Sequence, residues 1–347
     1  MFDNFVDIVG FQLEKVHTGV ISWLLDSRNP TVPESDRISL LSKLLSNGMQ
    51  NDDIASITPI QEYSFGRRRK IDLVVKVMMK KGDTCYLLIE CKTDSDVDYE
   101  QLQQSRNAFL KEDPHATCSF YVLTLGASQF TYQHMAEKIK ELGFNVLNVS
   151  GTRKKFSGLS LEGKNKIYDV WCNALKREEE RCLNVDKILL KMESPWDDRL
   201  RVRGYRLGFP LFYMYYAKLR ENLDNSPFKN WAIYTGRNNP VMNWQDGWIK
   251  NGQGEEALSL YWEFNWNSLI LKVELGDKDH DRWGSLKDKI VHLCKASPVP
   301  GRQPASREGT WVSVYKWEFN FCRTPVTEIS KNTVMILEDV HGRLRSL

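Results

Sequence analysis

The chain lacks several features that would assign it to a familiar class of protein. Its seven cysteines are scattered, with no Cys-x-x-Cys pair and no alternation with histidine, so neither a disulfide framework nor a zinc site is supported. No apolar run approaches the length that crosses a bilayer, and the N-terminus has neither the basic region nor the long apolar stretch of a signal peptide. We therefore expect a cytoplasmic protein that does not bind membranes.

A strong charge of one sign is also missing. The chain has 48 Lys and Arg against 45 Asp and Glu, and a net charge of +3 does not by itself indicate a polyanionic partner. The distribution of the basic residues is more informative. They cluster at Arg67–Lys70, at Arg153–Lys155 and at the arginines 199, 201, 203 and 206. The first cluster runs directly into an acidic residue of interest, which favours phosphate contact there.

That residue is Asp72, which together with Glu90 and Lys92 is the most informative feature present. Two apolar runs joined by a short turn at 80–83 predict a β-hairpin. Asp72 begins one run and Glu90 ends the other, so antiparallel pairing places both carboxylates at the same end. The two-residue period of a strand puts Lys92 on the same face as Glu90.

Two interpretations of this group compete. A Glu-x-Lys pair is common at a solvated strand edge. However, the continuous apolar run at 87–89 predicts a strand buried on both faces, where an ionised Glu90 and Lys92 are costly unless they are paired or bound to a metal. Carboxylate oxygens completed by substrate phosphate usually hold Mg²⁺. The residues therefore indicate a metal-dependent phosphodiesterase.

The pattern resembles that of the PD-(D/E)XK nuclease superfamily, in which an acid, a hairpin and a Glu-x-Lys motif occur in this order. Asp72 matches the first acid, Glu90 the second and Lys92 the lysine. Lys70-Ile71 stands where the superfamily motif has a proline before the first acid. The resemblance covers roughly residues 10 to 150.

Two helices extend the resemblance. The pair Gln101-Leu102 is similar to the Gln-Leu-x-x-Tyr helix of the RecB-like branches, with Ser105 in the place of the tyrosine. The segment from Glu14 to Asp26 is similar to the opening helix of one bacterial branch, which begins Glu-x-x-His; here the histidine is His17.

The resemblance implies a role for each matched residue. Asp72 and Glu90, with the backbone carbonyl of Cys91, would bind Mg²⁺, for which Mn²⁺ could substitute. Lys92 would orient or deprotonate the attacking water or stabilise the developing charge. Glu14 would add a metal ligand or hold Lys92, and Gln101 would contact phosphate or order Lys92. His17 lies three residues after Glu14 on the same helix face, and a role in the site and a role in helix packing fit it equally well.

Apolar periodicity predicts an α/β fold, a mixed sheet sandwiched by helices, which is the restriction-endonuclease-like architecture that the resemblance implies. The expected helices are 5–26, 36–45, 96–111 and 129–142, and the expected strands are 57–63, the two hairpin strands, 118–125 and 145–149. We assign residues 1–155 to the nuclease core, 156–200 to a helical connector that includes a long helix over 164–192, and 201–347 to a second, aromatic-rich α+β domain.

In this second domain we expect helices at 210–222, 283–295 and 326–344, and strands at 231–235, 258–266, 269–275 and 311–321. Nine of the eleven tryptophans lie from Trp196 onward. Their simpler interpretation is sheet core and cross-strand pairs. The alternative is a platform for base stacking, for which Trp244 and Trp248, in a Gly- and Asn-rich loop, are the candidates.

The sequence thus predicts a Mg²⁺-dependent nuclease whose partner is nucleic acid, with DNA favoured over RNA, and it allows a homodimer. Restriction, repair or antiviral defence would suit such an enzyme. Three alternatives stay open: an RNA nuclease, a catalytically idle nucleic-acid-binding protein on the same fold, and a sensor or interaction protein dominated by its aromatic half. Strong metal-dependent cleavage would separate the nuclease from the last of these alternatives.

Overall fold

The computed structural model describes residues 4–45, 54–65, 70–194, 210–235, 239–251, 258–275, 280–305 and 309–347. The chain divides into two compact units, Met1–Leu183 and Asn184–Leu347. No helix among the described residues is long and apolar enough to span a membrane.

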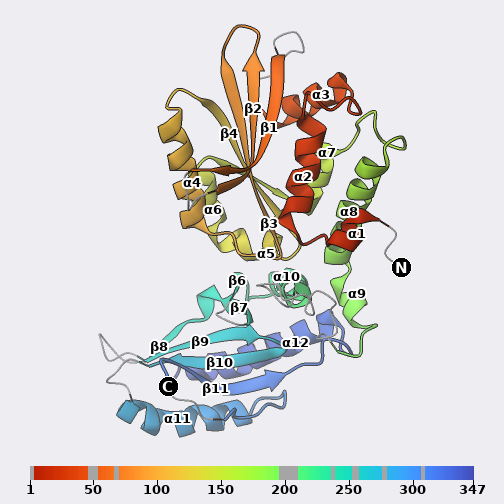
Figure 1. The fold of residues 1–347 in the computed structure, drawn as a ribbon. Helices are drawn as coiled ribbons and strands as arrows, with labels where there is room; N and C mark the ends of the chain where they lie inside the picture. The colour runs from red at the N-terminus through yellow and green to blue at the C-terminus, as the bar shows by residue number, and fades with distance from the viewer. Residues whose placement is uncertain are drawn as a thin grey trace. The chain divides into compact units, whose positions relative to one another are not determined.

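The first unit is built on a five-stranded mixed sheet with the order β1-β2-β3-β4-β5 (Figure 1). The strands are β1 (Ile54–Ser64), β2 (Lys70–Met79), β3 (Thr84–Thr93), β4 (Thr117–Leu125) and β5 (Phe144–Asn148). β1, β2 and β3 pair antiparallel, whereas β3, β4 and β5 pair parallel. The mixed sheet and the hairpin are as the sequence predicts, and β3 is buried over most of its length because both of its faces are covered.

Helices cover both faces of this sheet (Figure 1). The helices of this unit are α1 (Phe5–Val9), α2 (Glu14–Leu25), α3 (Glu34–Leu44), α4 (Tyr99–Glu112), α5 (Ser128–Thr131), the 3₁₀ helix η2 (Tyr132–Met135), α6 (Ala136–Glu141), α7 (Val149–Phe156) and α8 (Lys166–Leu183). One apolar core contains side chains of α2, α3, α7 and α8 together with alternate residues of β2 and β3. The other core contains side chains of α4 and α6 with the intervening strand residues. The result is the expected three-layer α/β sandwich.

Two of the expected helices are interrupted. The helix predicted over 5–26 is two helices, because Gly10 adopts a φ of 115° and its amide caps α1 by donating to the carbonyl of Val6. The helix predicted over 129–142 is three short pieces, α5, η2 and α6. The long helix predicted over 164–192 ends at Leu183, and a short helix α9 (Val185–Leu189) follows it after Asn184.

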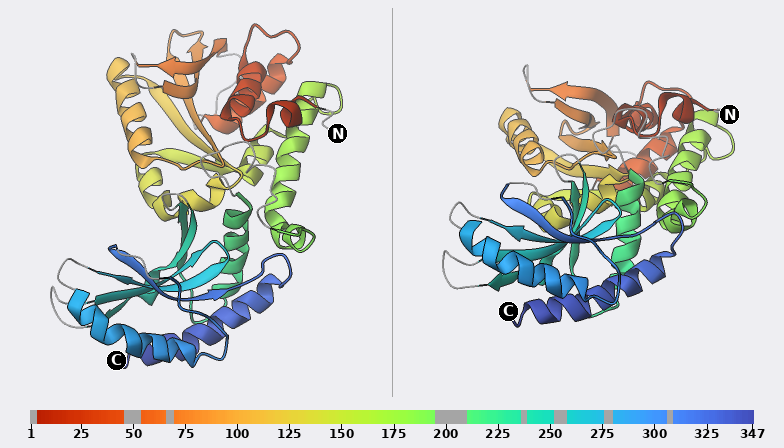
Figure 2. Two further views of the ribbon diagram at one scale, coloured as in Figure 1. Left: turned by 60° about the horizontal axis from the view of Figure 1, so that its bottom comes forward. Right: turned by 90° about the horizontal axis from the view of Figure 1, so that it is seen from below.

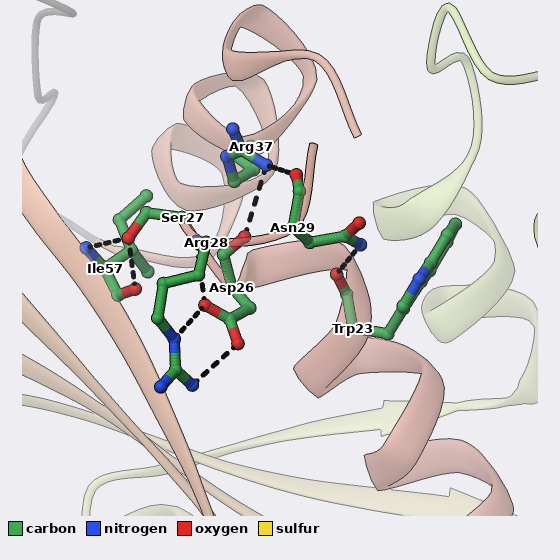
Figure 3. A network of polar contacts seen from close by, with 7 residues as sticks. All are labelled: Trp23, Asp26, Ser27, Arg28, Asn29, Arg37 and Ile57. Atoms are coloured by element: carbon green, nitrogen blue, oxygen red, sulfur yellow. Dashed lines mark hydrogen bonds and ion pairs between the residues drawn. The ribbon is translucent and has the colours of Figure 1, made fainter. Parts of the chain in front are cut away.

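Polar contacts fix the C-terminal end of α2 (Figure 3). The buried Arg37 of α3 donates to the carbonyls of Asp26 and Asn29, at 3.2 and 2.9 Å. The side chain of Asn29 donates to the carbonyl of Trp23, and Ser27 donates to the carbonyl of Ile57 on β1. These bonds satisfy backbone groups that a helix end leaves unpaired. They also tie α2, whose first residue is Glu14, to α3 and the sheet.

His17 anchors the other end of α2 and is structural. Its ring is fully buried, accepts a hydrogen bond from the indole of Trp171 on α8 at 3.2 Å, and contacts the Phe11 carbonyl at 2.6 Å through the other ring nitrogen. Because the indole can only donate, Nδ1 is the acceptor and Nε2 carries the proton. Burial lowers the pKa of His17 to about 4, so the ring is neutral at physiological pH.

The stability of the first unit should therefore fall as the pH drops from about 6.5 to about 4. In this window the unfolded chain binds a proton at His17 and the folded chain does not, which amounts to about 3 kcal/mol at about 1.4 kcal/mol per pKa unit. Denaturant unfolding at a series of pH values measures this effect. His17→Gln should flatten the profile between these limits, and the exposed His115→Gln should leave it unchanged. An identical profile in the His17 variant would contradict the assignment.

The second unit contains a six-stranded antiparallel sheet with the order β11-β10-β9-β7-β6, and β8 also pairs with β9 (Figures 1 and 2). The strands are β6 (Trp231–Thr235), β7 (Pro240–Trp244), β8 (Ile249–Asn251), β9 (Leu258–Asn265), β10 (Ser268–Glu274) and β11 (Trp311–Glu318). Besides α9, the helices of this unit are α10 (Pro210–Leu223), η5 (Gln245–Gly247), α11 (His280–Lys295), α12 (Val326–Ile336), η7 (Leu337–His341) and α13 (Gly342–Leu344). β7 and β8 replace the loop that the sequence predicts.

The two faces of this sheet differ. In β9, β10 and β11, one set of alternate positions carries the buried apolar residues Leu260, Trp262, Phe264, Leu269, Leu271, Val273, Val312, Tyr315 and Trp317. Tyr216 of α10 contacts Phe264, and α11 and α12 run along one side of the sheet in Figure 2. The opposite positions are mostly polar, as is common for an antiparallel sheet that packs helices on one face only.

Trp244 does not fit the alternative interpretation, a platform for base stacking. Only 5% of its surface is accessible, because it stacks on Trp231 across the β6–β7 pair and contacts Phe228 and His341. Trp248, in contrast, is 40% exposed. The loop composition around both residues is alike, so only the strand pairing separates them.

Candidate active site

Asp72 and Glu90 face each other at the end of the β2–β3 ladder. The antiparallel register pairs Leu73 with Ile89, so Asp72 and Glu90 occupy the next facing positions. There the carboxylate of Asp72 replaces a backbone partner: its Oδ2 accepts the amide of Cys91 at 2.8 Å. This bond fixes Asp72 beside Glu90. The other carboxylate oxygen of Asp72, Oδ1, takes no part in the bond.

Glu90 is a buried carboxylate without a hydrogen-bond donor. Only 2% of the residue is exposed, and neither carboxylate oxygen has a hydrogen-bond partner within the described part of the chain. The nearest cation is the ammonium of Lys92, 3.9 Å from Oε2, and Lys92 is itself only 8% exposed. A buried acceptor in this state is costly unless a ligand supplies positive charge or donors.

Four ionisable side chains interact in this group: Glu14, Asp72, Glu90 and Lys92. Burial raises the pKa of Glu90 well above its usual value, and the charge of Asp72 raises it further. Burial also raises the pKa of Glu14. Burial alone would lower the pKa of Lys92, but the three carboxylates, Glu90 foremost, raise it above the ordinary value. When all four are ionised, three carboxylates face one ammonium.

Glu14 reaches this group from the first residue of α2. Its Oε1 accepts the hydroxyl of Ser95 at 2.9 Å and the amide of Thr93 at 3.3 Å. The two donors follow Lys92 closely, Thr93 as the last residue of β3 and Ser95 just beyond it. The start of α2 and the end of β3 are thus joined through a single carboxylate oxygen.

The sequence did not single out the residues that hold this segment. Asp94 is buried with a φ of 52°, and its Oδ1 accepts the amide of Ala127 at 2.6 Å. Gly126 makes room for it, because a Cβ there would lie 2.2 Å from that same oxygen. Ser95 exchanges bonds with Ser128, whose hydroxyl accepts the amide of Ser95 and donates to its carbonyl. Aspartates also stand at 96 and 98, so the sequence does not distinguish Asp94 from them; Asp98 caps α4 by accepting the amide of Gln101.

Two other candidate residues lie differently. The thiol of Cys91 faces the opposite core, among side chains of α2, α7 and α8, and burial raises its pKa well above the usual value. A metal-binding role for its carbonyl stays a prediction. Gln101 is exposed in the first turn of α4, and no contact in the described structure joins its side chain to Glu90 or Lys92.

The basic clusters are only partly described. Arg67, Arg68 and Arg69 lie outside the described residues, as do the arginines 199, 201, 203 and 206. Lys70 lies 3.8 Å from the carboxylate of Glu62, and Arg153 pairs with Glu179 at 2.6 Å.

One comparison decides the family. A family model for the PD-(D/E)XK nuclease superfamily matches residues 3–189, more than half of the chain. The chain belongs to the PD-(D/E)XK nuclease superfamily. The matched range includes the whole five-stranded sheet and all four coupled residues, so the resemblance stated from the hairpin motif is confirmed at the level of the superfamily. No curated protein and no solved structure matches the chain.

Members of this superfamily generally use divalent metal ions, and the residues present fit one. Among the described residues, no three His, Cys, Asp or Glu side chains form a ready-made metal cage. Mg²⁺ does not need one, because it is usually held by one or two carboxylates, with water and substrate phosphate as the other ligands. Glu90, whose oxygens have no hydrogen-bond donor in the described structure, and the neighbouring Asp72 would provide two such carboxylates. When Glu14, Asp72, Glu90 and Lys92 are all ionised, the group has two negative charges in excess, which one divalent cation would balance.

Proposed function

We propose that this protein is a metal-dependent nuclease that hydrolyses phosphodiester bonds in DNA. The observation that carries the proposal is the buried Glu90 carboxylate, which lacks donors and lies beside Asp72 and Lys92 in a chain of the nuclease superfamily. A purely structural carboxylate at this depth would be expected to have hydrogen-bond partners. The choice of DNA over RNA rests on the resemblance, and the experiment that tests the proposal therefore includes RNA as a substrate.

In this proposal Asp72 and Glu90 hold a divalent cation, Mg²⁺ or Mn²⁺, which when bound would polarise the phosphate and activate the attacking water. The bond from Cys91 to Asp72 fixes the direction of one of the two carboxylates. Lys92 is the cation beside Glu90, and it would contact the attacking water or the phosphate oxygens on which charge develops.

Glu14 would hold in place the residues that follow Lys92. Its bonds to Thr93 and Ser95 keep the end of β3 against α2, so that Lys92 has little freedom to leave the carboxylates. Positioning of this kind matters because phosphoryl transfer depends mainly on alignment and on stabilisation of charge.

The test is incubation of the purified chain with plasmid, linear duplex DNA, single-stranded DNA and RNA, with Mg²⁺, with Mn²⁺ and with chelator. We expect cleavage of DNA with either metal and none with chelator. Nicked or linearised plasmid would show endonuclease action. Cleavage that persists in chelator would overturn the metal-dependent mechanism. Binding of nucleic acid without turnover under every metal condition would identify a catalytically idle binding protein instead.

A further inference from the structure

The polar face of the β9–β10–β11 sheet carries a cavity and an aromatic group that the nuclease site does not use. On this face Lys272 stands opposite Tyr261 on one side and Ser313 on the other, and Ile270 stands opposite Lys316. A cavity of about 460 Å³ opens here, lined by Ile270, Lys272, Arg302, Trp311, Ser313 and Lys316 among others. This volume is within the usual range for small-ligand sites.

Trp311 lines the cavity and belongs to a group of three aromatic rings. Trp248 stacks on Tyr261 with ring centroids 4.7 Å apart, and Trp311 meets both rings edge to face. Trp311 is 50% exposed and Trp248 is 40% exposed, and they are the two tryptophans with large exposed surfaces among the described residues. Neighbouring exposed tryptophans are unusual on a soluble protein unless they contact a ligand.

The part of the lining around Arg302 is held in place by β11. Arg302 forms a two-way backbone bridge with Lys316, at 2.8 and 2.9 Å, and Tyr315 donates to the carbonyl of Gly301. Gly301 permits this approach, because a Cβ there would lie 2.6 Å from the Tyr315 ring and 2.8 Å from the Lys316 carbonyl. This part of the lining is therefore a built feature that presents the guanidinium of Arg302.

The charges of the cavity are partly balanced. Lys272 pairs with the buried Glu263 at 3.0 Å, while Arg302 and Lys316 share Glu318, at 2.8 and 2.6 Å. Three cations thus face two carboxylates, and the side chain of Arg302 is 59% exposed. A ligand for this site should have an aromatic group to stack on the exposed rings and a limited negative charge, because the cations exceed the carboxylates by only one.

We propose that this face binds a single-stranded segment of nucleic acid, with a base stacked on Trp311 or Trp248 and its phosphate at Arg302 and Lys316. Single-strand binding surfaces combine stacking aromatics with cations along the backbone, and the π-face of every base makes stacking tolerant of sequence. A duplex conceals its bases, so this surface favours a single strand. The proposal rests on the proposed nuclease function, and it assigns a substrate-binding role to the second unit.

The experiment measures the affinity of full-length Glu90→Gln protein for a labelled single-stranded oligonucleotide by fluorescence anisotropy. Trp311→Leu keeps an apolar side chain but removes the ring, and we expect it to weaken binding by about 5- to 100-fold. Trp311→Phe, which keeps an aromatic ring, should retain most of the affinity. If the contact were merely apolar, the Leu and Phe variants would bind alike. If Trp311→Leu does not fold, as judged by circular dichroism, Trp248→Leu replaces it.

Charge is tested separately across a salt series. Arg302→Gln should reduce the slope of log affinity against log salt by about 0.7, the value for one phosphate contact of a single strand. Lys289→Gln, an exposed cation on α11, should leave the slope unchanged. Replacing Arg302 leaves Glu318 paired with Lys316, so the effect is not one of an orphaned carboxylate.

Unchanged affinity in both tryptophan variants would overturn the proposal, and so would binding of free mononucleotide without binding of the strand. In otherwise active protein, Trp311→Leu should raise the KM for single-stranded substrate and leave kcat unchanged. Failure of the proposed function would look different: the unmodified chain would cleave none of the substrates.

Discussion

Glu90→Gln should reduce cleavage by about 10³-fold or more, and Asp72→Asn and Lys92→Met should be similarly damaging. Each replacement has nearly the shape of the native side chain and removes a charge from the group of four coupled residues. Loss of a single electrostatic element from an active site costs about 10² to 10³ in rate, and loss of a metal ligand also weakens the cation that the others serve. Initial rates on the DNA that the unmodified chain cleaves measure the effect.

The matched control is Glu141→Gln, which makes the same chemical change at the exposed end of α6 and should retain full activity. Circular dichroism should show that all four variants are folded. A folded Glu90→Gln protein that cleaves at the normal rate would sink the assignment of this group as the active site.

The second expected result is that Glu90→Gln stabilises the metal-free protein. The native carboxylate is buried, has no hydrogen-bond donor in the described structure and lies beside Asp72, so it carries a desolvation cost that a neutral amide largely avoids. We expect a gain of about 1–3 kcal/mol, seen in chelator as a melting temperature higher by about 2–10 °C.

Divalent cation should reverse this order. Mg²⁺ or Mn²⁺ should raise the melting temperature of the unmodified chain, because a ligand that binds only the folded state stabilises it by mass action. Glu90→Gln should show little of that rise, and Glu141→Gln should show all of it. This readout is independent of turnover, so it locates the cation even if the preferred substrate is unknown. Equal metal-induced shifts in both variants would place the cation elsewhere.

Both results would join stability to function in one residue. Lys92 partly offsets the charge of Glu90 at the end of β3, and in the proposed function a bound cation would offset the remainder. The metal-free protein would then be less stable locally because its charged site is preorganised for the cation.

Much of the first unit could be predicted because its signals are local. The period of two along β2 and β3, and a short turn between them, are enough to set the register that brings Asp72 opposite Glu90. The position of Lys92 on the same face as Glu90 follows from the same period of two. The mixed sheet follows from the order of strands and helices, since a strand that is separated from the next by a helix pairs with it in parallel.

Contacts between distant segments could not be predicted in this way. Glu14 meets Thr93 and Ser95 across 79 and 81 residues, and Asp94 meets Ala127 across 33. Nothing in the composition near Ser95 marks it, because its bond depends on where α2 packs on the sheet. His17 likewise is settled as a packing residue by Trp171, 154 residues away.

In the second unit the sequence alone determined which segments are aromatic and β-forming, and tertiary structure decided what those aromatics do. Trp244 and Trp248 are four residues apart in one Gly- and Asn-rich stretch of sequence. Pairing of β7 with β6 and β9 nevertheless buries the first, and the turn that follows leaves the second at the surface. Alternation assigns residues to two faces, but it does not say which face the helices will cover. Burial is a property of the packed elements, and for that reason the cavity beside Trp311 is visible only in the folded chain.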